Sequence, residues 1–191
     1  MSKSIYIEKN TELVEACKLG SRSAQYKLYN LYAKAMFNVS LRIVNHRGEA
    51  EDVLQEAFID AFAKIGTFRQ EASFGVWLKQ IVVNKAISTL RKKKLEFLDI
   101  ENEAYRIENE NFTETEFPSE SPETNCDYRV EAINKGMKML PEGYRVVLSL
   151  YLFEGYDHEE ISDVLGISVS TSRTQFMRGK MRLTEVLKDL L

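Results

Sequence analysis

A short basic segment near the end of the chain has the side chains that proteins use to bind DNA. Residues 170–182 contain four basic residues and no acidic residue. Arg, Thr and Gln can hydrogen-bond to base edges in the major groove, and basic side chains can bind phosphates. The segment predicts a DNA-binding helix, although a basic amphipathic helix on a solvated surface would have the same composition.

The residues before this segment have the pattern of a helix-turn-helix. Asp157 and Glu160 have the spacing of a capping box at the start of a first helix. Gly166 ends that helix where a left-handed residue is needed, and Ser168 or Ser170 can cap the second helix. A short helix, a tight turn and a basic second helix form an arrangement that reads duplex DNA.

A second basic segment lies in the first half of the chain, next to aromatic residues. Residues 79–94 contain six bases and no acid, and Phe68, Phe74 and Trp77 precede them. Basic charge beside aromatic rings is typical of single-stranded DNA binding, because each unpaired base can stack on a ring. Two other interpretations remain: Trp77 could belong to the core, and Arg91 to Lys94 could form a solvated helix end favoured by the helix dipole.

Residues 49–65 predict a helix with an apolar stripe and an acidic polar face. Its polar residues are Asp52, Gln55, Glu56 and Asp60, and Ile59 lies beside them. The face could bind a divalent metal, dock a basic partner helix or be plainly solvated. A metal site usually draws its ligands from several segments, and no His joins this cluster, so the composition favours a protein-binding face.

These candidate surfaces must be positioned by helices, because helical periodicity recurs along both halves of the chain and no strand pair is evident. Gly20 and Gly66 end two of the predicted helices, and Pro141 fits the start of another. The predicted helices cover residues 12–19, 22–45, 49–65, 74–93, 128–139, 142–153, 157–165 and 170–189. The fold class is therefore all-α.

An acidic segment separates two predicted domains, residues 1–94 and 128–191. Residues 95–131 contain twelve acids and two bases, a net charge of −10, whereas the rest of the chain has 24 bases and 17 acids. Two prolines and low hydrophobicity predict a flexible linker over residues 95–127. Residues 96–127 number 32, and they would span about 30 Å as a random coil and about 105 Å when fully extended.

The remaining composition excludes several classes of protein. The chain has 191 residues and a net charge of −3. The two cysteines, Cys17 and Cys126, are far apart and form no disulfide framework or metal motif. No apolar run is long enough to span a membrane, and the N-terminus lacks a signal sequence, so we expect a cytoplasmic protein without membrane insertion.

Four segments of the sequence resemble one protein family, the extracytoplasmic-function (ECF) sigma factors of bacterial RNA polymerase. Residues 49–62 (EAEDVLQEAFIDAF) resemble the polymerase-binding helix of the family, and residues 74–93 (FGVWLKQIVVNKAISTLRKK) resemble its helix for recognising and melting the −10 element. Residues 140–148 (LPEGYRVVL) and 154–173 resemble its C-terminal domain. The segments occur in the family's order, and the family's central domain is missing, as in the ECF group.

The resemblance implies a role for each candidate residue. The polymerase contacts would be Asp52, Gln55, Glu56 and Ile59. The −10 contacts would be Lys79, Asn84, Lys85, Arg91 and Lys92, with Asn84 at the position that reads an extruded base. Phe68 and Trp77 are further candidate −10 contacts, from their place beside the basic segment; the family does not assign the loop 67–73 that contains Phe68. The −35 contacts would be Ser170, Thr171, Arg173, Thr174, Gln175, Met177, Arg178 and Lys180. Gln175 and Gly179 depart from the family pattern, which has a basic residue and an Ala there, and leave the −35 sequence open.

The resemblance also implies partners. They are core RNA polymerase, through the coiled coil of its largest subunit and its flap, promoter DNA, and an anti-sigma factor. We expect no cofactor, no metal and no catalytic residue. Three alternatives remain: a stand-alone helix-turn-helix regulator, a metal-dependent nuclease or hydrolase, and a purely protein-binding adaptor.

Overall fold

The computed structural model describes residues 10–100 and 125–190, and within these ranges every regular element is a helix. The first part of the chain forms α1 (Thr11–Lys18), α2 (Arg22–Val44), α3 (Arg47–Lys64), the 3-10 turn η1 (Ile65–Thr67) and α4 (Phe74–Ile100). The second part forms α5 (Asn125–Lys138), α6 (Glu142–Leu148), the π-helical turn η2 (Ser149–Phe153), α7 (His158–Leu165) and α8 (Val169–Leu190). The all-α prediction is confirmed for the described residues.

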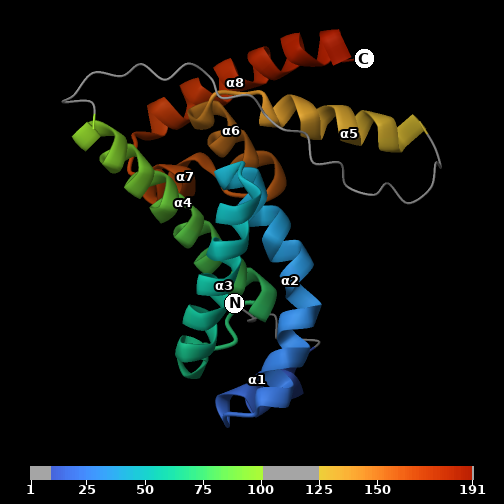
Figure 1. The fold of residues 1–191 in the computed structure, drawn as a ribbon, viewed down its shortest axis with the longest axis vertical. Helices are drawn as coiled ribbons and strands as arrows, with labels where there is room; N and C mark the ends of the chain where they lie inside the picture. Colours follow the sequence, from blue (N-terminus) through green and yellow to red (C-terminus); the bar gives the residue numbers. More distant parts are fainter. Residues whose placement is uncertain (1–9, 101–124, 191) are drawn as a thin grey trace, which may run out of the picture.

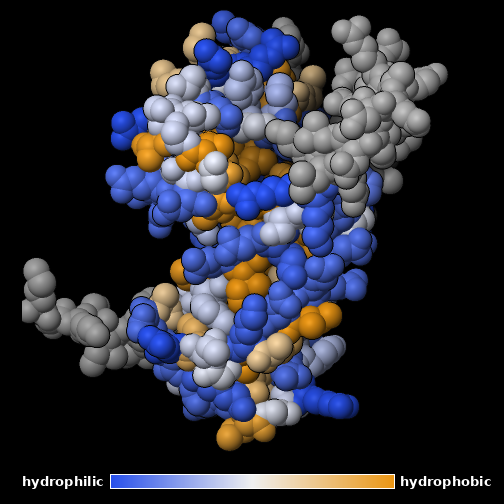
Figure 2. All heavy atoms as spheres, turned by 90° about the vertical axis from the view of Figure 1, so that its left-hand side faces the viewer, coloured by the Kyte–Doolittle hydropathy of each residue, from blue (hydrophilic) through white to orange (hydrophobic). Residues whose placement is uncertain are grey.

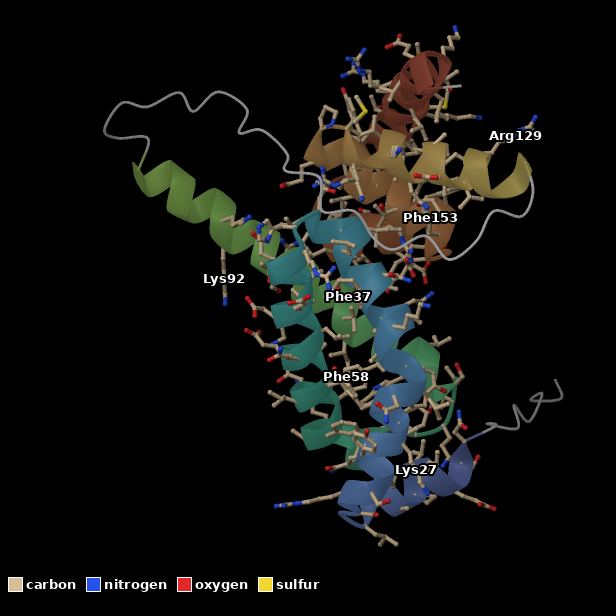
Figure 3. The ribbon with its side chains drawn as sticks, turned by 45° about the vertical axis from the view of Figure 1, so that its right-hand side comes forward. Lys27, Phe37, Phe58, Lys92, Arg129 and Phe153 are labelled. Atoms are coloured by element: carbon tan, nitrogen blue, oxygen red, sulfur yellow. The ribbon has the colours of Figure 1, made fainter. Side chains whose placement is uncertain are left out.

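Helices α1–α4, called here the N-terminal part, form the lower body of the molecule in Figure 1. Helices α2, α3 and α4 pack against one another in every pairing. Fully buried side chains such as Leu28, Phe74 and Leu78 fill the space between them. Figure 3 shows Phe58 between α3 and α2, where its ring meets that of Tyr29 at a centroid distance of 4.8 Å. The apolar stripe predicted for α3 is thus the face that it buries.

Helices α5–α8, called here the C-terminal part, lie across the top of the N-terminal part (Figure 1). Pro141 precedes α6, as expected, and α6 packs against α8. Gly179 allows this packing: a Cβ atom there would lie 3.0 Å from Tyr144 Cβ and 3.2 Å from Leu148 Cδ1. The glycine therefore permits a close crossing of α8 over α6.

Two predicted helix ends differ from the structure by three residues or more. α4 continues to Ile100, six residues into the predicted linker, and α5 begins at Asn125 instead of residue 128. Residues 95–98 (LEFL) are mostly good helix formers, and adding a residue to an existing helix costs less than starting a new one. The acidic composition indicated a linker, but it did not mark where the helix ends. Residues 101–124 of that prediction lie outside the described residues.

The two parts share one apolar core. Four buried residues of the C-terminal part belong to the same cluster as the core of the N-terminal part: Val146, Val147, Leu150 and Ile161. We call this contact of α6, η2 and α7 with α2 and α4 the seam. Phe153 lies at the edge of the C-terminal part nearest α2 (Figure 3), and the Arg42 guanidinium lies 5.2 Å from the centre of its ring.

Candidate nucleic-acid and protein interfaces

The helix-turn-helix is formed by α7, a turn at Gly166 and α8. The Asp157 carboxylate accepts hydrogen bonds from the backbone N–H groups of Glu159 and Glu160, and the Glu160 carboxylate accepts one from Asp157 N–H. Gly166 has φ 66°, in the left-handed region. Ser168 Oγ accepts from Thr171 N–H at 3.0 Å, so Ser168 caps α8. The capping box and the turn are confirmed, and the choice between the two serines is settled.

The predicted −35 contacts lie along the outer face of α8. The exposed residues among them are Ser170, Thr171, Arg173, Thr174, Met177, Arg178 and Lys180. Gln175 differs, because it is half-buried and its side-chain amide lies close to Gly143 at the start of α6. Seven of the eight residues are therefore exposed to solvent, while Gln175 faces the rest of the C-terminal part.

The basic residues of α4 are more constrained. Asn84 and Lys92 are exposed, and Lys92 points away from the helices in Figure 3. Lys79 Nζ donates to the backbone oxygen of Glu154 at 2.7 Å, and Arg91 Nη2 donates to that of Val164 at 3.0 Å. Two of the predicted phosphate contacts are thus bonded to the C-terminal part.

A third basic residue of α4, Lys85, lies against α3. Its Nζ lies 2.9 Å from Asp60 Oδ2 and 3.3 Å from Glu56 Oε2. The hydrogen bond from Lys85 lowers the pKa of the Asp60 carboxyl below its ordinary value, and the hydrogen bond to Asp60 raises the pKa of Lys85. Lys85 is therefore held in its charged form by two acidic residues.

The aromatic residues near the start of α4 form a cluster. The Phe68 ring lies 5.9 Å from that of Phe74 and 5.2 Å from that of Trp77. Phe68 is only 4% exposed and packs against these two rings, so its prediction as a DNA contact is corrected: the residue is buried in this structure. Trp77 is half-buried in the same cluster, so the residue remains partly accessible to solvent.

The four predicted polymerase contacts form one exposed face of α3. Asp52, Gln55 and Glu56 are exposed, and Ile59 is 68% exposed although it is apolar. A groove of about 610 Å³ runs between α3 and α4, and Asp52, Glu56, Asn84 and Lys85 are among its lining residues. The side of the molecule on which α4 lies is largely hydrophilic, with hydrophobic side chains showing between the hydrophilic ones (Figure 2).

The acidic face of α3 shows no metal-binding geometry. Within residues 10–100 and 125–190, no group of three or more His, Cys, Asp and Glu residues is arranged to hold a metal ion. Three acidic groups of α3 instead pair with basic residues of α4: Glu56 and Asp60 with Lys85, and Glu49 with Lys93. None of the described helices has the length and hydrophobicity needed to cross a membrane.

The seam contains charged residues that the sequence did not single out. Glu154 is buried at 8% exposure, and its Oε1 lies 2.5 Å from Arg42 Nη2. Its Oε2 lies 3.8 Å from Lys79 Nζ. Nearby, burial raises the pKa of the Tyr156 hydroxyl, and the charges of Glu160 and Glu154 add to the effect. Arg42 and Glu154 are 112 residues apart, so no local pattern could have paired them.

Comparisons with known proteins agree with this arrangement. The family model for Sigma-70 region 2 matches residues 28–96, and that for Sigma-70, region 4 matches residues 131–183. The chain is 31% identical over 189 residues to the RNA polymerase sigma-H factor of Pseudomonas aeruginosa, covering 96% of each protein. It is 29% identical over 181 residues to the ECF RNA polymerase sigma factor SigW of Bacillus subtilis, covering 93% of this chain and 96% of the relative.

The fold is also found among solved structures. The sigma factor RpoE of Bartonella quintana, crystallised with the anti-sigma factor NepR, matches with a TM-score of 0.58 and 23% identity. The match covers 85% of this chain and 96% of that one. From the helix-turn-helix, the matches to both sigma regions and the relatives that align over nearly the whole chain, it follows that this protein belongs to the sigma-70 family, in its extracytoplasmic-function group, and acts with core RNA polymerase in promoter-directed transcription initiation.

Proposed function

We propose that three surfaces divide the work of this sigma factor. The exposed face of α3 binds the coiled coil of the largest polymerase subunit, α4 holds the opened −10 strand, and the outer face of α8 reads the −35 duplex. The C-terminal part also contacts the polymerase flap. The polymerase supplies the chemistry, and we assign no catalytic residue and no cofactor to this chain, which acts in the cytoplasm.

The observation that carries the proposal is the exposure of Ile59 on an otherwise polar face. An apolar side chain that is 68% exposed, one helical turn after Gln55 and Glu56, is suited to the centre of a protein interface, with polar residues at its rim. The acidic neighbours match a basic partner helix, because complementary charge steers association and fixes register. The same face would be unexplained in a stand-alone DNA-binding regulator.

The division between the two DNA-binding surfaces follows from their chemistry. α8 presents Arg173, Thr174 and Arg178 on one exposed face that can enter a major groove. α4 combines basic residues with the half-buried Trp77, and an aromatic ring beside positive charge favours an unpaired strand. Asn84 is exposed beside them and can hydrogen-bond to an extruded base.

An anti-sigma factor is a further proposed partner. The family resemblance implies one, and the Bartonella relative was crystallised with its anti-sigma factor. Co-purification of the tagged chain from its own cells, followed by mass spectrometry, would identify such a partner.

The substitution Ile59→Glu tests the polymerase contact. It places a charge at the centre of the proposed interface, and we expect it to weaken binding to core polymerase by about 2 kcal/mol or more, the size of an interface hot spot. Binding is measured with purified core enzyme, and run-off transcription is measured in parallel.

The matched control is Leu19→Glu, which makes the same chemical change at an exposed position at the end of α1. We expect this variant to bind core polymerase as the wild type does. Wild-type affinity in Ile59→Glu would remove α3 from the proposed interface.

A further inference from the structure

A polar contact lies between the two helices of the helix-turn-helix, among apolar side chains. Ser172 of α8 is fully buried, and its Oγ lies 2.9 Å from Nδ1 of His158, the first residue of α7. The apolar side chains of the same core cluster include Ile161 of α7 and Phe176 of α8. A hydrogen bond has a preferred direction, whereas apolar packing has none, so this bond can fix how α8 is turned about its axis.

The imidazole of His158 is itself held by two aromatic rings. It stacks on Tyr151 of η2, with a centroid distance of 4.9 Å and an angle of 27° between the rings. It also makes a T-shaped contact with Phe176 of α8, at 5.6 Å and 77°. Tyr151 and Phe176 contact each other at 4.5 Å. Rings from η2, α7 and α8 thus meet beside the hydrogen bond, and packing of this kind leaves a side chain little freedom to turn.

α8 is held a second time, two turns further along. Gly179 lies close against α6, as described above, and it follows Ser172 by seven residues. Seven residues make nearly two turns of an α-helix, so these two residues lie on the same, inward face. The exposed residues Arg173, Thr174 and Arg178 lie between about 100° and 240° further round the helix. The rotation of α8 about its axis therefore decides which of their side chains can reach a base.

We propose that His158 is a positioning residue for −35 recognition, which acts through Ser172 to set the rotation of α8 and with it the bases that α8 can read. This inference rests on the −35 role proposed for α8. His158 itself makes no DNA contact in this scheme. A rotated helix loses its hydrogen bonds to base edges, which carry the sequence information, while its basic side chains stay near the phosphates, which carry much of the affinity.

The test uses holoenzyme, reconstituted from core polymerase and the full chain, and a promoter that the wild type selects from a library. Discrimination is the ratio of the affinity for this promoter to the affinity for a version with one base pair changed in the −35 element. For the wild type we expect a ratio of about 5 to 150 for each contacted base pair. Ser172→Ala removes the hydroxyl, and we expect the ratio to fall by about two- to tenfold, the size of one hydrogen bond.

A double variant separates positioning from stability. Ser172→Ala alone leaves Nδ1 of His158 without its partner, which also lowers the free energy of unfolding. Adding His158→Phe makes the contact apolar on both sides and keeps a ring to stack on Tyr151. The free energy of unfolding, measured in urea, should then return close to the wild-type value. Discrimination should stay as low as in Ser172→Ala, because apolar packing restores no direction.

His158→Asn is the conservative variant, because the Asn amide places a polar atom where Nδ1 lies in His and can keep the bond to Ser172. We expect it to retain more discrimination than Ser172→Ala does. An equal loss in the two variants would mean that the ring, and not the bond, orients α8, and would overturn the inference. Glu159→Gln changes the next, exposed residue of α7 and should leave the ratio at its wild-type value.

Failure of the inference and failure of the −35 role give different results. If wild-type holoenzyme does not distinguish the −35 versions, the role proposed for α8 is wrong. If the wild type distinguishes them and the double variant does so equally well, apolar packing alone orients α8. The same conclusion follows if discrimination and stability are lost in Ser172→Ala and regained together in the double variant. Either of these last two results overturns the positioning role of His158.

Discussion

The two basic helices of this protein, α4 and α8, have similar compositions and different surroundings. Residues 79–94 of α4 and residues 170–182 of α8 both contain several bases and no acid. In α8, Arg173, Arg178 and Lys180 are exposed. In α4, by contrast, Lys79, Lys85 and Arg91 are all bonded to neighbouring helices or to the loop before α7.

The difference shows that positive charge in a sequence does not measure the charge available to a ligand. The bases of α8 lie on the outer face of a helix whose other face packs on α6 and α7. Lys79, Lys85 and Arg91 of α4 lie at contacts with an acidic helix on one side and the C-terminal part on the other, whereas Lys92 is exposed. DNA binding to Lys79, Lys85 and Arg91 must replace existing bonds, whereas binding to Arg173, Arg178 and Lys180 of α8 need not. We therefore expect α8 substitutions to weaken DNA binding more strongly.

The largest effect is expected from Arg173→Ala in α8. This substitution removes an exposed side chain that can hydrogen-bond to a base edge, and we expect a loss of about 1–3 kcal/mol in promoter binding. The measurement is the affinity of reconstituted holoenzyme for a promoter selected from a library. In α4, Lys79→Ala should cost less, because Lys79 must give up its bonds to Glu154 before it reaches a phosphate.

Lys188→Ala provides the control, since it removes an exposed basic residue from the last turn of the same helix. It should leave the affinity for the promoter close to the wild-type value. A greater loss for Lys79→Ala than for Arg173→Ala would reverse the comparison between the two helices.

Local patterns predicted the elements of this fold well, because helix ends depend on nearby residues. The capping box of Asp157 and Glu160 and the left-handed turn at Gly166 could be located from spacing alone. The apolar stripe of α3 likewise predicted which of its faces would be buried. The family resemblance then assigned roles to the candidate surfaces on these helices.

Contacts between residues far apart in the sequence could not be predicted from such local patterns. Phe68 was predicted to contact DNA because it is aromatic and lies near basic residues, but it is buried in the core, where it packs against Phe74 and Trp77. Composition cannot distinguish a ring that stacks on a base from one that stacks on another ring. Glu154 was missed because its partners lie 75 and 112 residues away in the sequence.

A smaller effect, on the free energy of unfolding, is expected from Gly179→Ala, which changes the packing of α8 against α6. The new Cβ would lie 3.0 Å from Tyr144 Cβ, so the helices must move apart. Overpacking of this kind costs about 1–3 kcal/mol, and Ala recovers about 1 kcal/mol of helix propensity, so we expect a net loss of about 1 kcal/mol in the free energy of unfolding. Urea denaturation followed by circular dichroism measures it.

The matched substitution is Gly66→Ala, at a glycine where an added Cβ meets no atom within 4 Å. It should leave the free energy of unfolding unchanged or slightly higher, because Ala lowers the entropy of the unfolded chain. If Gly179→Ala were equally harmless, the crossing of α8 over α6 would not need a glycine, and the departure from the family's Ala would have no packing reason.

The smallest effect concerns the pairing of Lys85 with α3. The hydrogen bond from Lys85 is the main cause of the lowered pKa of Asp60. Lys85→Gln should therefore raise the pKa of Asp60 toward its ordinary value, as measured by a carboxyl NMR titration. Because the folded-state pKa is lowered, the pair stabilises the fold above the ordinary pKa of Asp and loses this effect as the pH falls through the lowered value. The variant should lose this part of the acid dependence.

Lys64→Gln gives the control, because Lys64 lowers the pKa of Asp60 only as the last and smallest of the contributing groups. Its removal should raise the pKa of Asp60 less than removal of Lys85 does. Equal shifts in the two variants would mean that Lys85 acts only as a nearby charge and makes no specific hydrogen bond. Lys85 would then be as available to DNA as the exposed bases of α8, and this part of the contrast between the two helices would disappear.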